Sequence, residues 1–225
     1  MRKNQYKSDK NTLFSLKEIQ QSDVVIGVDE AGRGAWAGPV VAACVAWSGR
    51  NPLKNMLRDS KKMTAEDREI TYGEIFDLAQ EGKLFLWIGV IDSTTIDTLG
   101  IKEANRLAMF EALQAMKNEE WSMKNRGISV IIDWRDNYTF DIPGLPEPHY
   151  IVRGDSKIKQ IMAASILAKV TRDKIMIEYE DIFPGYGFAR HKGYGTSLHQ
   201  GMLKKLGVRE VHRKSYKPIC VLLSC

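Results

Sequence analysis

The segment from Val24 to Trp47, VVIGVDEAGRGAWAGPVVAACVAW, constrains the fold more than any other part of the sequence. It contains two apolar runs, Val24–Asp29 and Val40–Trp47, on either side of a loop that carries glycine and proline. Apolar runs bounded by turn residues are typical of buried strands, and a short glycine-bearing connection is typical of a hairpin. The segment therefore predicts two neighbouring strands joined as a hairpin.

The loop of this hairpin formally satisfies the dinucleotide-binding fingerprint G-x-G-x-x-[GA], from Gly32 to Ala37. A dinucleotide fold needs a helix to begin at these glycines, so that the first N–H groups of the helix face the pyrophosphate. Here Pro39 and a strand-like run follow instead. Two carboxylates, Asp29 and Glu30, also precede the glycines and would repel a pyrophosphate. The sequence thus disfavours a nucleotide cofactor at this loop.

Further strands and helices alternate along the rest of the chain. Thr64 and Asp67 have the spacing of a capping box and Gly82 is a stop signal, so a helix is expected between them. Apolar patterns predict the remaining elements: strands at 83–91, 128–133 and 148–155, long helices at 93–118 and 158–183, and a short helix before Gly207. This order indicates an α/β fold with a mixed central sheet flanked by helices and a C-terminal helical segment.

The length of 225 residues fits one domain with a small appendage, namely a basic N-terminal extension at 1–22 before a domain at 23–225. A net charge of +5 is compatible with a nucleic-acid partner without requiring one. No apolar run reaches the roughly 18 residues of a membrane span, and the N-terminal segment lacks the apolar core of a secretory signal. Three cysteines without a CxxC pair favour a reducing cytoplasm, with Cys44 as a buried apolar side chain.

Three aspartates, Asp29, Asp133 and Asp155, each close an apolar strand-like run, and active sites of α/β sheets gather at strand ends. Glu30 can join them only if its strand bends or ends there, because consecutive strand residues face opposite sides. Like charges about 4 Å apart repel by about 4 kcal/mol at an effective dielectric constant of 20. A buried cluster therefore needs protonation or a cation, and an all-oxygen cluster favours Mg²⁺ or Mn²⁺. The alternative is that each aspartate is a turn former or helix cap.

The residues around these carboxylates carry a resemblance to a known family. The segment GVDEAGRGAWAGPVVAACV resembles the first signature of type 2 ribonucleases H (ribonuclease HII). The resemblance continues, in the family's order, through LRDSKKMT, VIIDW, VRGDSKIKQIMAASILAKVTRDK, FPGYGFARHKGYGTSLH and HRKSYKP. It implies a ribonuclease H-like fold and a metal-dependent endoribonuclease. Such an enzyme hydrolyses the RNA strand of RNA/DNA hybrids and nicks duplex DNA on the 5′ side of a single embedded ribonucleotide.

The resemblance also implies which residues perform the chemistry. The metal-binding carboxylates would be Asp29, Glu30, Asp133 and Asp155. Two divalent ions, Mn²⁺ or Mg²⁺, would lower the pKa of an attacking water and stabilise the leaving 3′-oxygen. The products would carry 5′-phosphate and 3′-hydroxyl ends, and no side-chain nucleophile would be required. The implied partners are RNA/DNA hybrids and ribonucleotide-containing duplex DNA, with the protein acting as a monomer.

Recognition of the ribonucleotide would involve two glycine-rich segments. Gly32, Arg33 and Gly34 match the family's ribonucleotide-reading loop, in which backbone groups approach the 2′-hydroxyl and the arginine holds a phosphate. The alternative is that the same three residues form an ordinary tight turn. Tyr194 in KGYGT matches the tyrosine that stacks on the sugar at the RNA–DNA junction, and Tyr186 in PGYGF is the competing candidate.

One segment departs from the family pattern. After the third carboxylate the family usually has glycine and then asparagine, whereas this chain has DWRDN. Trp134 thus puts a bulky ring beside Asp133, and Asp136 becomes a rival ligand.

Several other polar residues receive simpler interpretations. Five residues of basic type are expected either to contact phosphates or to form solvated surface: Lys61, Lys62, Arg190, His191 and Lys192. Three histidines lack zinc-ligand spacing and are expected at the surface or in hydrogen bonds: His191, His199 and His212. Ser165, among small residues, is expected to be a helix-packing position, and Asp173 is expected to pair with Lys169 one helical turn away.

Two rival functions remain open at this point. The first is the type 3 ribonuclease H activity, which shares the fold and carboxylates but requires a run of ribonucleotides. The short segment before the first strand and the presence of Tyr194 disfavour it. The second is a non-catalytic hybrid-binding protein, which the four matching carboxylates disfavour. The C-terminal PICVLLSC shows no clear pattern for binding a processivity clamp.

Overall fold

The computed structural model describes residues 22–54, 56–57, 63–117, 127–134 and 140–223. Three of the sequence-based expectations therefore concern positions outside the described residues. These are the N-terminal extension up to residue 21, the phosphate contacts Lys61 and Lys62, and the rival ligand Asp136.

A five-stranded mixed sheet forms the centre of the molecule, in the order β3-β2-β1-β4-β5. Its strands are β1 (Val24–Ala31), β2 (Val40–Ser48), β3 (Phe85–Ile91), β4 (Ile128–Ile132) and β5 (His149–Tyr150). The first three strands pair antiparallel, whereas β4 pairs parallel with both β1 and β5. The predicted hairpin and the predicted mixed sheet are both confirmed.

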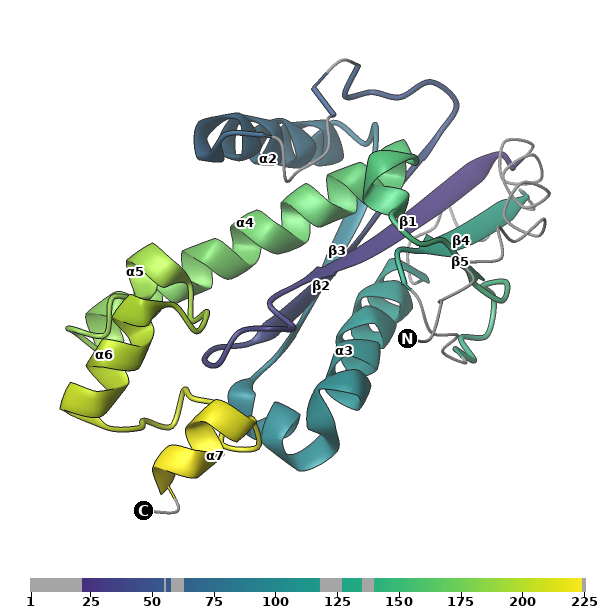
Figure 1. Cartoon of the computed structure of the whole chain (residues 1–225). Coiled ribbons are helices and arrows are strands. Elements are labelled where there is room, and N and C mark those ends of the chain that lie inside the picture. Colours follow the sequence, from purple (N-terminus) through teal and green to yellow (C-terminus); the bar gives the residue numbers. More distant parts are fainter. Residues whose placement is uncertain (1–21, 55, 58–62, 118–126, 135–139, 224–225) are drawn as a thin grey trace, which may run out of the picture.

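Helices cover both faces of this sheet (Figure 1). On one face lies α3 (Ser93–Lys117), which is broken at Gly100, and on the other lies α4 (Lys159–Ile182), with α2 (Ala65–Gln80) packed beside it. Alternate residues of β1 and β2 enter these two apolar layers, as the period of two requires. The short helices α5 (Phe188–His191), α6 (Ser197–Leu206) and α7 (Lys217–Leu223) follow α4 and make a third apolar cluster.

Local sequence signals explain where several elements begin and end. The Thr64 hydroxyl accepts a hydrogen bond from the Asp67 amide at 3.0 Å, and the Asp67 carboxylate accepts one from the Thr64 amide at 3.4 Å. This is the predicted capping box, and α2 ends at Gln80, two residues before the predicted stop at Gly82. The Cys44 thiol is buried in the sheet and donates to the carbonyl of Ala112 at 3.2 Å, so it is the expected small core side chain.

The strand predicted at 148–155 is wrong for most of its length. Pairing ends with β5 at Tyr150, and the chain turns at Arg153, which has a positive φ of 59°, into the short 3₁₀ helix η3 (Gly154–Ser156). The apolar residues that suggested a longer strand pack against a helix instead of pairing in the sheet. Ile151 packs with Ile158 and Ile161 at the start of α4. Asp155 therefore lies on η3 and not at a strand end. Among the described residues, no helix is long and apolar enough to cross a membrane.

Candidate active site

The first two carboxylates lie near the end of β1, on opposite faces of the sheet. In the register of the hairpin Asp29 is opposite Ala43 and Glu30 is opposite Ala42. Ala43 belongs to the apolar layer under α4 and Ala42 to the layer under α3. Because β1 continues to Ala31, the alternation is not interrupted at Glu30. The two side chains thus reach the same edge of the sheet from its two sides.

Asp29 lies in the layer under α4, where only 8% of its surface is exposed. Burial, followed by the charge of Asp133, raises the pKa of Asp29 to about 8, although a hydrogen bond from Ser165 on α4 opposes the rise. The carboxyl group therefore retains its proton near neutral pH unless a cation replaces that proton. The sequence had suggested only that Ser165 packs the helix, but Ser165 also forms a hydrogen bond with Asp29. A lone polar side chain in the Ala-rich face of α4 was the only signal of this role.

Asp133 and Asp155 meet across the end of β4. The Asp133 amide donates to the carbonyl of Val28 at 3.0 Å, which places Asp133 beside the strand that carries Asp29. The Asp155 amide donates to Asp133 Oδ2 at 3.1 Å. Burial raises the pKa of Asp133, while the backbone N–H groups of Asp155, Gly154 and Arg153 partly counteract it. The turn at η3 thus serves to aim backbone donors at the Asp133 carboxylate.

Glu30 carries the least satisfied oxygen of this edge. Its Oε2 atom is buried and has no hydrogen-bond partner in the described residues. Its Oε1 atom lies 4.0 Å from Nη1 of Arg33, the one cation near it in the structure as described. Burial and the charge of Asp29 raise the pKa of Glu30 well above its ordinary value, and Arg33 lowers it only in part.

The residues at this edge fit a divalent metal in their chemistry. Asp29, Glu30, Asp133 and Asp155 offer only oxygen donors, which hard cations such as Mg²⁺ and Mn²⁺ prefer. The buried, unpartnered oxygen of Glu30 and the raised pKa values of three of the four carboxyl groups indicate missing positive charge. In the described parts of the chain, however, no three such side chains already close on a single ion position.

Two buried arginines hold the loop that links β1 and β2. Arg172 of α4 donates to the carbonyls of Pro39 at 2.9 Å and Ala37 at 3.1 Å. Its Nε atom would be only 2.0 Å from a Cβ atom at position 32, where the backbone has a φ of +94°, so only glycine fits there. Arg213 approaches from the C-terminal segment and donates to the Arg33 carbonyl at 2.8 Å.

Both guanidinium groups are fully buried, and burial lowers the pKa of Arg172 to about 10 and that of Arg213 below its ordinary value. Sequence reasoning missed both arginines. Their positions, RDK after an Ala-rich helix face and HRKSY after α6, look like ordinary basic surface in a sequence.

The Arg33 side chain stacks on Trp134. Its Cζ atom lies 3.9 Å from the centre of the indole ring. Trp134 itself is nearly buried, so it forms a firm support for the half-exposed guanidinium group. The tryptophan that departs from the family pattern therefore has a local structural role, which is to hold Arg33 beside Glu30.

The two candidate tyrosines differ in exposure. Tyr186 is 2% exposed and its hydroxyl donates to the carbonyls of Leu206 and Gly207, so its ring is unavailable to a ligand. Tyr194 is 37% exposed, and its ring lies 5.3 Å from Cζ of Arg172 and 5.9 Å from Nζ of Lys169. Of the two, Tyr194 alone presents a ring at the surface.

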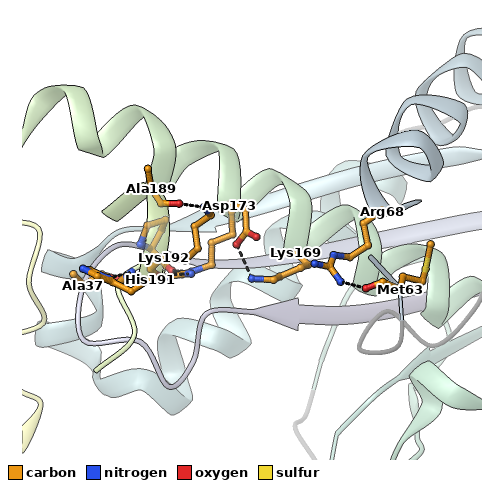
Figure 2. A network of polar contacts seen from close by, with 11 residues as sticks. Ala37, Met63, Arg68, Lys169, Asp173, Ala189, His191 and Lys192 are labelled. Carbon is orange, nitrogen blue, oxygen red and sulfur yellow. Dashed lines mark hydrogen bonds and ion pairs between the residues drawn. The ribbon is translucent and has the colours of Figure 1, made fainter. Parts of the chain in front are cut away.

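Figure 2 shows a network of polar contacts along α4 that includes Lys169, Asp173 and Lys192. Lys169 donates to Asp173 at 2.6 Å, which confirms the predicted helical pair. Lys192 donates to the carbonyl of Ala189, close to His191. The expectation of surface positions is wrong for His191, His199 and His212, which are all buried, whereas the expectation of hydrogen bonds is confirmed.

The sequence matches the family described as Ribonuclease HII over residues 26–219. The Ribonuclease HII of Dehalococcoides mccartyi is 40% identical over 200 residues, which are 87% of this chain and 86% of that protein. The Ribonuclease HII of Chloroflexus aurantiacus is 42% identical over 198 residues, 86% of each chain. The chain belongs to the ribonuclease HII family.

Solved structures show the same fold as this family member. The ribonuclease H2 of Pyrococcus horikoshii has a TM-score of 0.69 at 24% identity, covering 89% of this chain and 97% of its own. The RNase HII of Archaeoglobus fulgidus, solved in a complex with PCNA, has a TM-score of 0.70 at 24% identity, covering 88% and 96%. The structure of Bst-RNase HIII with Mn²⁺ has a TM-score of 0.69 at 15% identity, covering 92% and 71%. The predicted ribonuclease H-like fold is confirmed.

Membership of the ribonuclease HII family establishes the general activity. The chain is a hydrolase and a metal-dependent ribonuclease, with ribonuclease H activity on RNA/DNA hybrids. The reaction therefore takes place on a phosphodiester backbone and depends on a divalent metal.

Proposed function

We propose that this ribonuclease HII also nicks duplex DNA on the 5′ side of a single embedded ribonucleotide. The observation that carries this proposal is the junction of two loops beside the carboxylates. The amide of Trp36 donates to the carbonyl of Gly193 at 2.8 Å, which ties the Gly32–Gly34 loop to the segment that presents Tyr194. A loop whose backbone can approach a 2′-hydroxyl and a ring that can stack on a sugar are thus held together.

The proposed metal ligands are Asp29, Glu30, Asp133 and Asp155, and the proposed ions are Mn²⁺ or Mg²⁺, with two bound during catalysis. When bound, such ions lower the pKa of an attacking water and stabilise the leaving 3′-oxygen, giving 5′-phosphate and 3′-hydroxyl ends. Asp29 would release a proton on ion binding, because burial raises its pKa to about 8. Burial also raises the pKa of Glu30. The backbone donors of η3 keep the Asp133 carboxylate in place throughout.

Substrate reading is proposed for the Gly32–Gly34 loop and for Tyr194. The buried guanidinium of Arg213 fixes the Arg33 carbonyl, and Tyr216 donates to the same oxygen at 2.5 Å. The Arg33 side chain, stacked on Trp134, remains about 43% exposed and can take a backbone phosphate with its forked donors. Phosphate contacts of this kind make affinity fall as salt rises.

The organisation proposed for the protein is a single catalytic domain at 23–225 that acts as a monomer. One structural neighbour, the Archaeoglobus fulgidus RNase HII, was solved in a complex with PCNA. The C-terminal segment PICVLLSC of this chain shows no clear clamp-binding pattern, and we propose that catalysis does not require such a partner.

A cleavage assay on three labelled substrates tests the proposal. The substrates are a DNA duplex with one ribonucleotide, a duplex with a run of four ribonucleotides, and a continuous RNA/DNA hybrid, each with Mg²⁺, with Mn²⁺ or with a chelator. We expect metal-dependent cleavage of all three and a single nick on the 5′ side of the lone ribonucleotide. Cleavage of only the run and the hybrid would instead indicate the type 3 activity, and binding without cleavage would indicate a hybrid-binding protein.

The Tyr194→Ala variant sharpens this assay. We expect it to reduce nicking at the single ribonucleotide about tenfold more than it reduces duplex affinity, which corresponds to a loss of about 1.4 kcal/mol of contact with the sugar. Tyr186→Phe is the control, because it alters a tyrosine whose ring is buried and unavailable to the substrate. Equal losses of nicking and affinity would remove Tyr194 from substrate reading.

A further inference from the structure

Three histidines form a buried cluster directly beneath Tyr194. His191 belongs to α5, His199 to α6, and His212 to the segment after α6. The rings of His191 and His199 stack with their centres 4.3 Å apart, and those of His199 and His212 lie 5.3 Å apart. His199 and His212 are 13 residues apart in the chain, yet the fold brings all three rings into one line of contacts. Among the described residues this cluster does not have the arrangement of a metal site.

The acceptor at Tyr194 determines which atom donates in each hydrogen bond between this residue, His199 and His212. The Tyr194 carbonyl oxygen is an acceptor, so His199 Nδ1, 3.1 Å away, must carry a proton and donate it. Burial lowers the pKa of both His199 and His212 to about 4, so each ring is neutral and carries a single proton. His199 Nε2 is then an acceptor.

The remaining proton positions follow from this. His212 must donate from its Nε2 atom to His199 Nε2, across the 3.1 Å that separates them. His212 Nδ1 then has a lone pair, which accepts the amide N–H of Arg209 at 3.0 Å. It therefore cannot donate to the Arg209 carbonyl oxygen, 3.2 Å away, which accepts instead from the His212 amide at 3.0 Å. The result is a chain of donors that runs from the backbone of Arg209 through two imidazole rings to the backbone of Tyr194.

This chain of donors ends at Tyr194, in the segment that is hydrogen-bonded to the loop following Gly32–Gly34. The Tyr194 amide donates to the His191 carbonyl at 2.9 Å, and the Gly193 amide donates to His191 Nδ1 at 3.1 Å. A Cβ atom at position 193, where φ is +79°, would lie 2.4 Å from the carbonyl oxygen of Ala37, so the two loops touch backbone to backbone there. Any movement of the Tyr194 backbone is therefore resisted from below by the histidines.

We propose that His199 is a positioning residue for single-ribonucleotide recognition, because its hydrogen bond to the Tyr194 carbonyl fixes the backbone and hence the ring of Tyr194, while His212 keeps the proton of His199 on Nδ1. The inference rests on the proposed function of Tyr194 and adds the part of the protein that sets its position. Both histidines are fully buried, so the role is exerted through Tyr194 and not by contact with a substrate. Recognition of one ribonucleotide depends on this placement more than recognition of a ribonucleotide run, in which neighbouring 2′-hydroxyls supply further contacts.

A matched pair of substitutions at one position separates positioning from general stability. In His199→Asn the side-chain amide can take the place of Nδ1 and donate to Tyr194, but the acceptor for His212 is lost. In His199→Gln the side-chain oxygen can reach the place of Nε2 and accept from His212, but the donor to Tyr194 is lost. Each variant loses one buried hydrogen bond, so a purely structural role predicts equal effects.

The kinetic measurement is the ratio of kcat/KM on the single-ribonucleotide duplex to kcat/KM on the four-ribonucleotide duplex. We expect His199→Gln to lower this ratio about tenfold, which corresponds to the loss of one buried hydrogen bond. We expect His199→Asn to leave the ratio within about twofold of that of the unaltered protein. Equal ratios in the two variants, or an unchanged ratio in His199→Gln, would overturn the proposal.

Amide hydrogen exchange gives a readout that does not depend on activity. In the unaltered protein, we expect the amides of Tyr194 and Thr196, which donate to His191 and Tyr194, to exchange as slowly as interior amides of α6. We expect them to exchange faster in His199→Gln but not in His199→Asn. Rapid exchange in the unaltered protein would overturn the positioning role even if a variant failed to fold. If the unaltered protein cut only ribonucleotide runs, the function proposed for Tyr194 would fail, while exchange would still decide the positioning.

Discussion

The carboxylate edge of the sheet and the loop junction under Tyr194 are both rich in buried polar groups, but they satisfy these groups differently. At the carboxylate edge, like charges share a buried space, and one oxygen of Glu30 has no partner in the described residues. At the loop junction, Arg172, Arg213 and His199 donate to backbone carbonyls with good geometry. The first region retains an unpartnered buried oxygen among the described residues, as the proposed cation site requires, whereas the second satisfies its donors within the protein.

The difference shows how one fold separates two tasks. Buried polar groups are costly unless hydrogen-bonded, and buried charges are costlier still. A site built to bind a cation must retain unsatisfied negative charge, which destabilises the protein alone. A site built to read a sugar by shape must keep its geometry before the substrate arrives, because ordering it during binding would cost affinity. Four predictions test this contrast, from the largest expected effect to the smallest.

Asp133→Asn is expected to have the largest effect. Loss of one charged ligand should reduce cleavage of RNA/DNA hybrids by at least about a hundredfold, because metal stabilisation of the transition state is worth several kcal/mol. The asparagine oxygen can still accept from the Asp155 amide, and a charge that raises the pKa of Asp29 disappears. The metal-free protein should therefore unfold at the same or a higher urea concentration. Asp181→Asn, an exposed position on α4, is the control.

Normal cleavage by Asp133→Asn would contradict the ligand assignment. A loss of stability comparable with the loss of activity would mean that Asp133 is part of the structural framework, and the contrast between the two regions would fail.

Arg172→Lys tests the loop junction, where stability and not ion binding should respond. Lysine keeps the charge but lacks the fork that reaches the carbonyls of Ala37 and Lys192, so these buried acceptors would lose their donors. We expect the free energy of unfolding, measured with urea, to fall by about 3 kcal/mol. Arg106→Lys, in an exposed pair with Glu103, should change it by less than about 0.5 kcal/mol. A similar small change in Arg172→Lys would show that the junction is not held in this way.

The two regions should also respond to pH in opposite directions. The pKa of Asp29 is raised from 3.8 to about 8, so its contribution to stability is present at low pH and is lost as pH rises toward 8. The pKa values of His199 and His212 are lowered from 6.5 to about 4, so their contribution is present above pH 6.5 and is lost as pH falls toward 4.

Melting curves with and without Mg²⁺ detect this difference. The ion competes with the proton on Asp29. As long as the pH is below the pKa of this carboxyl group, each rise of one pH unit favours ion binding by about 1.4 kcal/mol. Mg²⁺ should therefore raise Tm by several degrees more at pH 8 than at pH 5.5. Asp29→Asn should weaken this pH dependence of the Mg²⁺ effect, because Glu30 and Asp133, whose pKa values are also raised, remain, and His199→Asn should not weaken it. An Mg²⁺ effect that does not change with pH would contradict a protonated Asp29.

Trp134→Leu should have the smallest effect. A stacked guanidinium contributes about 0.5–1 kcal/mol at exposed sites, so removal of the ring should reduce single-ribonucleotide nicking about two- to fivefold. Cleavage of the continuous hybrid should change less. Trp87→Leu, in β3 and outside both regions, controls for the loss of an indole ring. If the two variants behave alike, Trp134 does not support Arg33 in recognition.

Local signals predicted much of the fold correctly. Alternation and turn residues identified the hairpin, and the Thr64–Asp67 pair identified the start of α2, since both depend on interactions within a few residues. The strand expected at 148–155 was wrong, because Ile151 is apolar for contact with α4 and not for pairing in the sheet. A sequence pattern reports that a residue is buried but does not report which element buries it.

The candidate site was predictable in its chemistry and not in its geometry. The four carboxylates, Arg33 and Tyr194 were identified from short motifs and from the family resemblance, and their roles remain proposals. The burial of Tyr186, the hydrogen bond from Ser165 to Asp29 and the stacking of Arg33 on Trp134 depend on residues far apart in the chain. None of these contacts has a local signature.

The sequence by itself determined the donor chemistry of this protein: oxygen ligands at strand and turn ends, glycines where a backbone must bend, and an aromatic ring between glycines. Only the tertiary structure decided which polar groups lack partners and which are satisfied. His199, His212, Arg172 and Arg213 look like exposed polar residues in the sequence, yet they are buried and hydrogen-bonded. The physical reason is that the cost of burying a polar group depends on partners that the fold alone brings within about 3 Å.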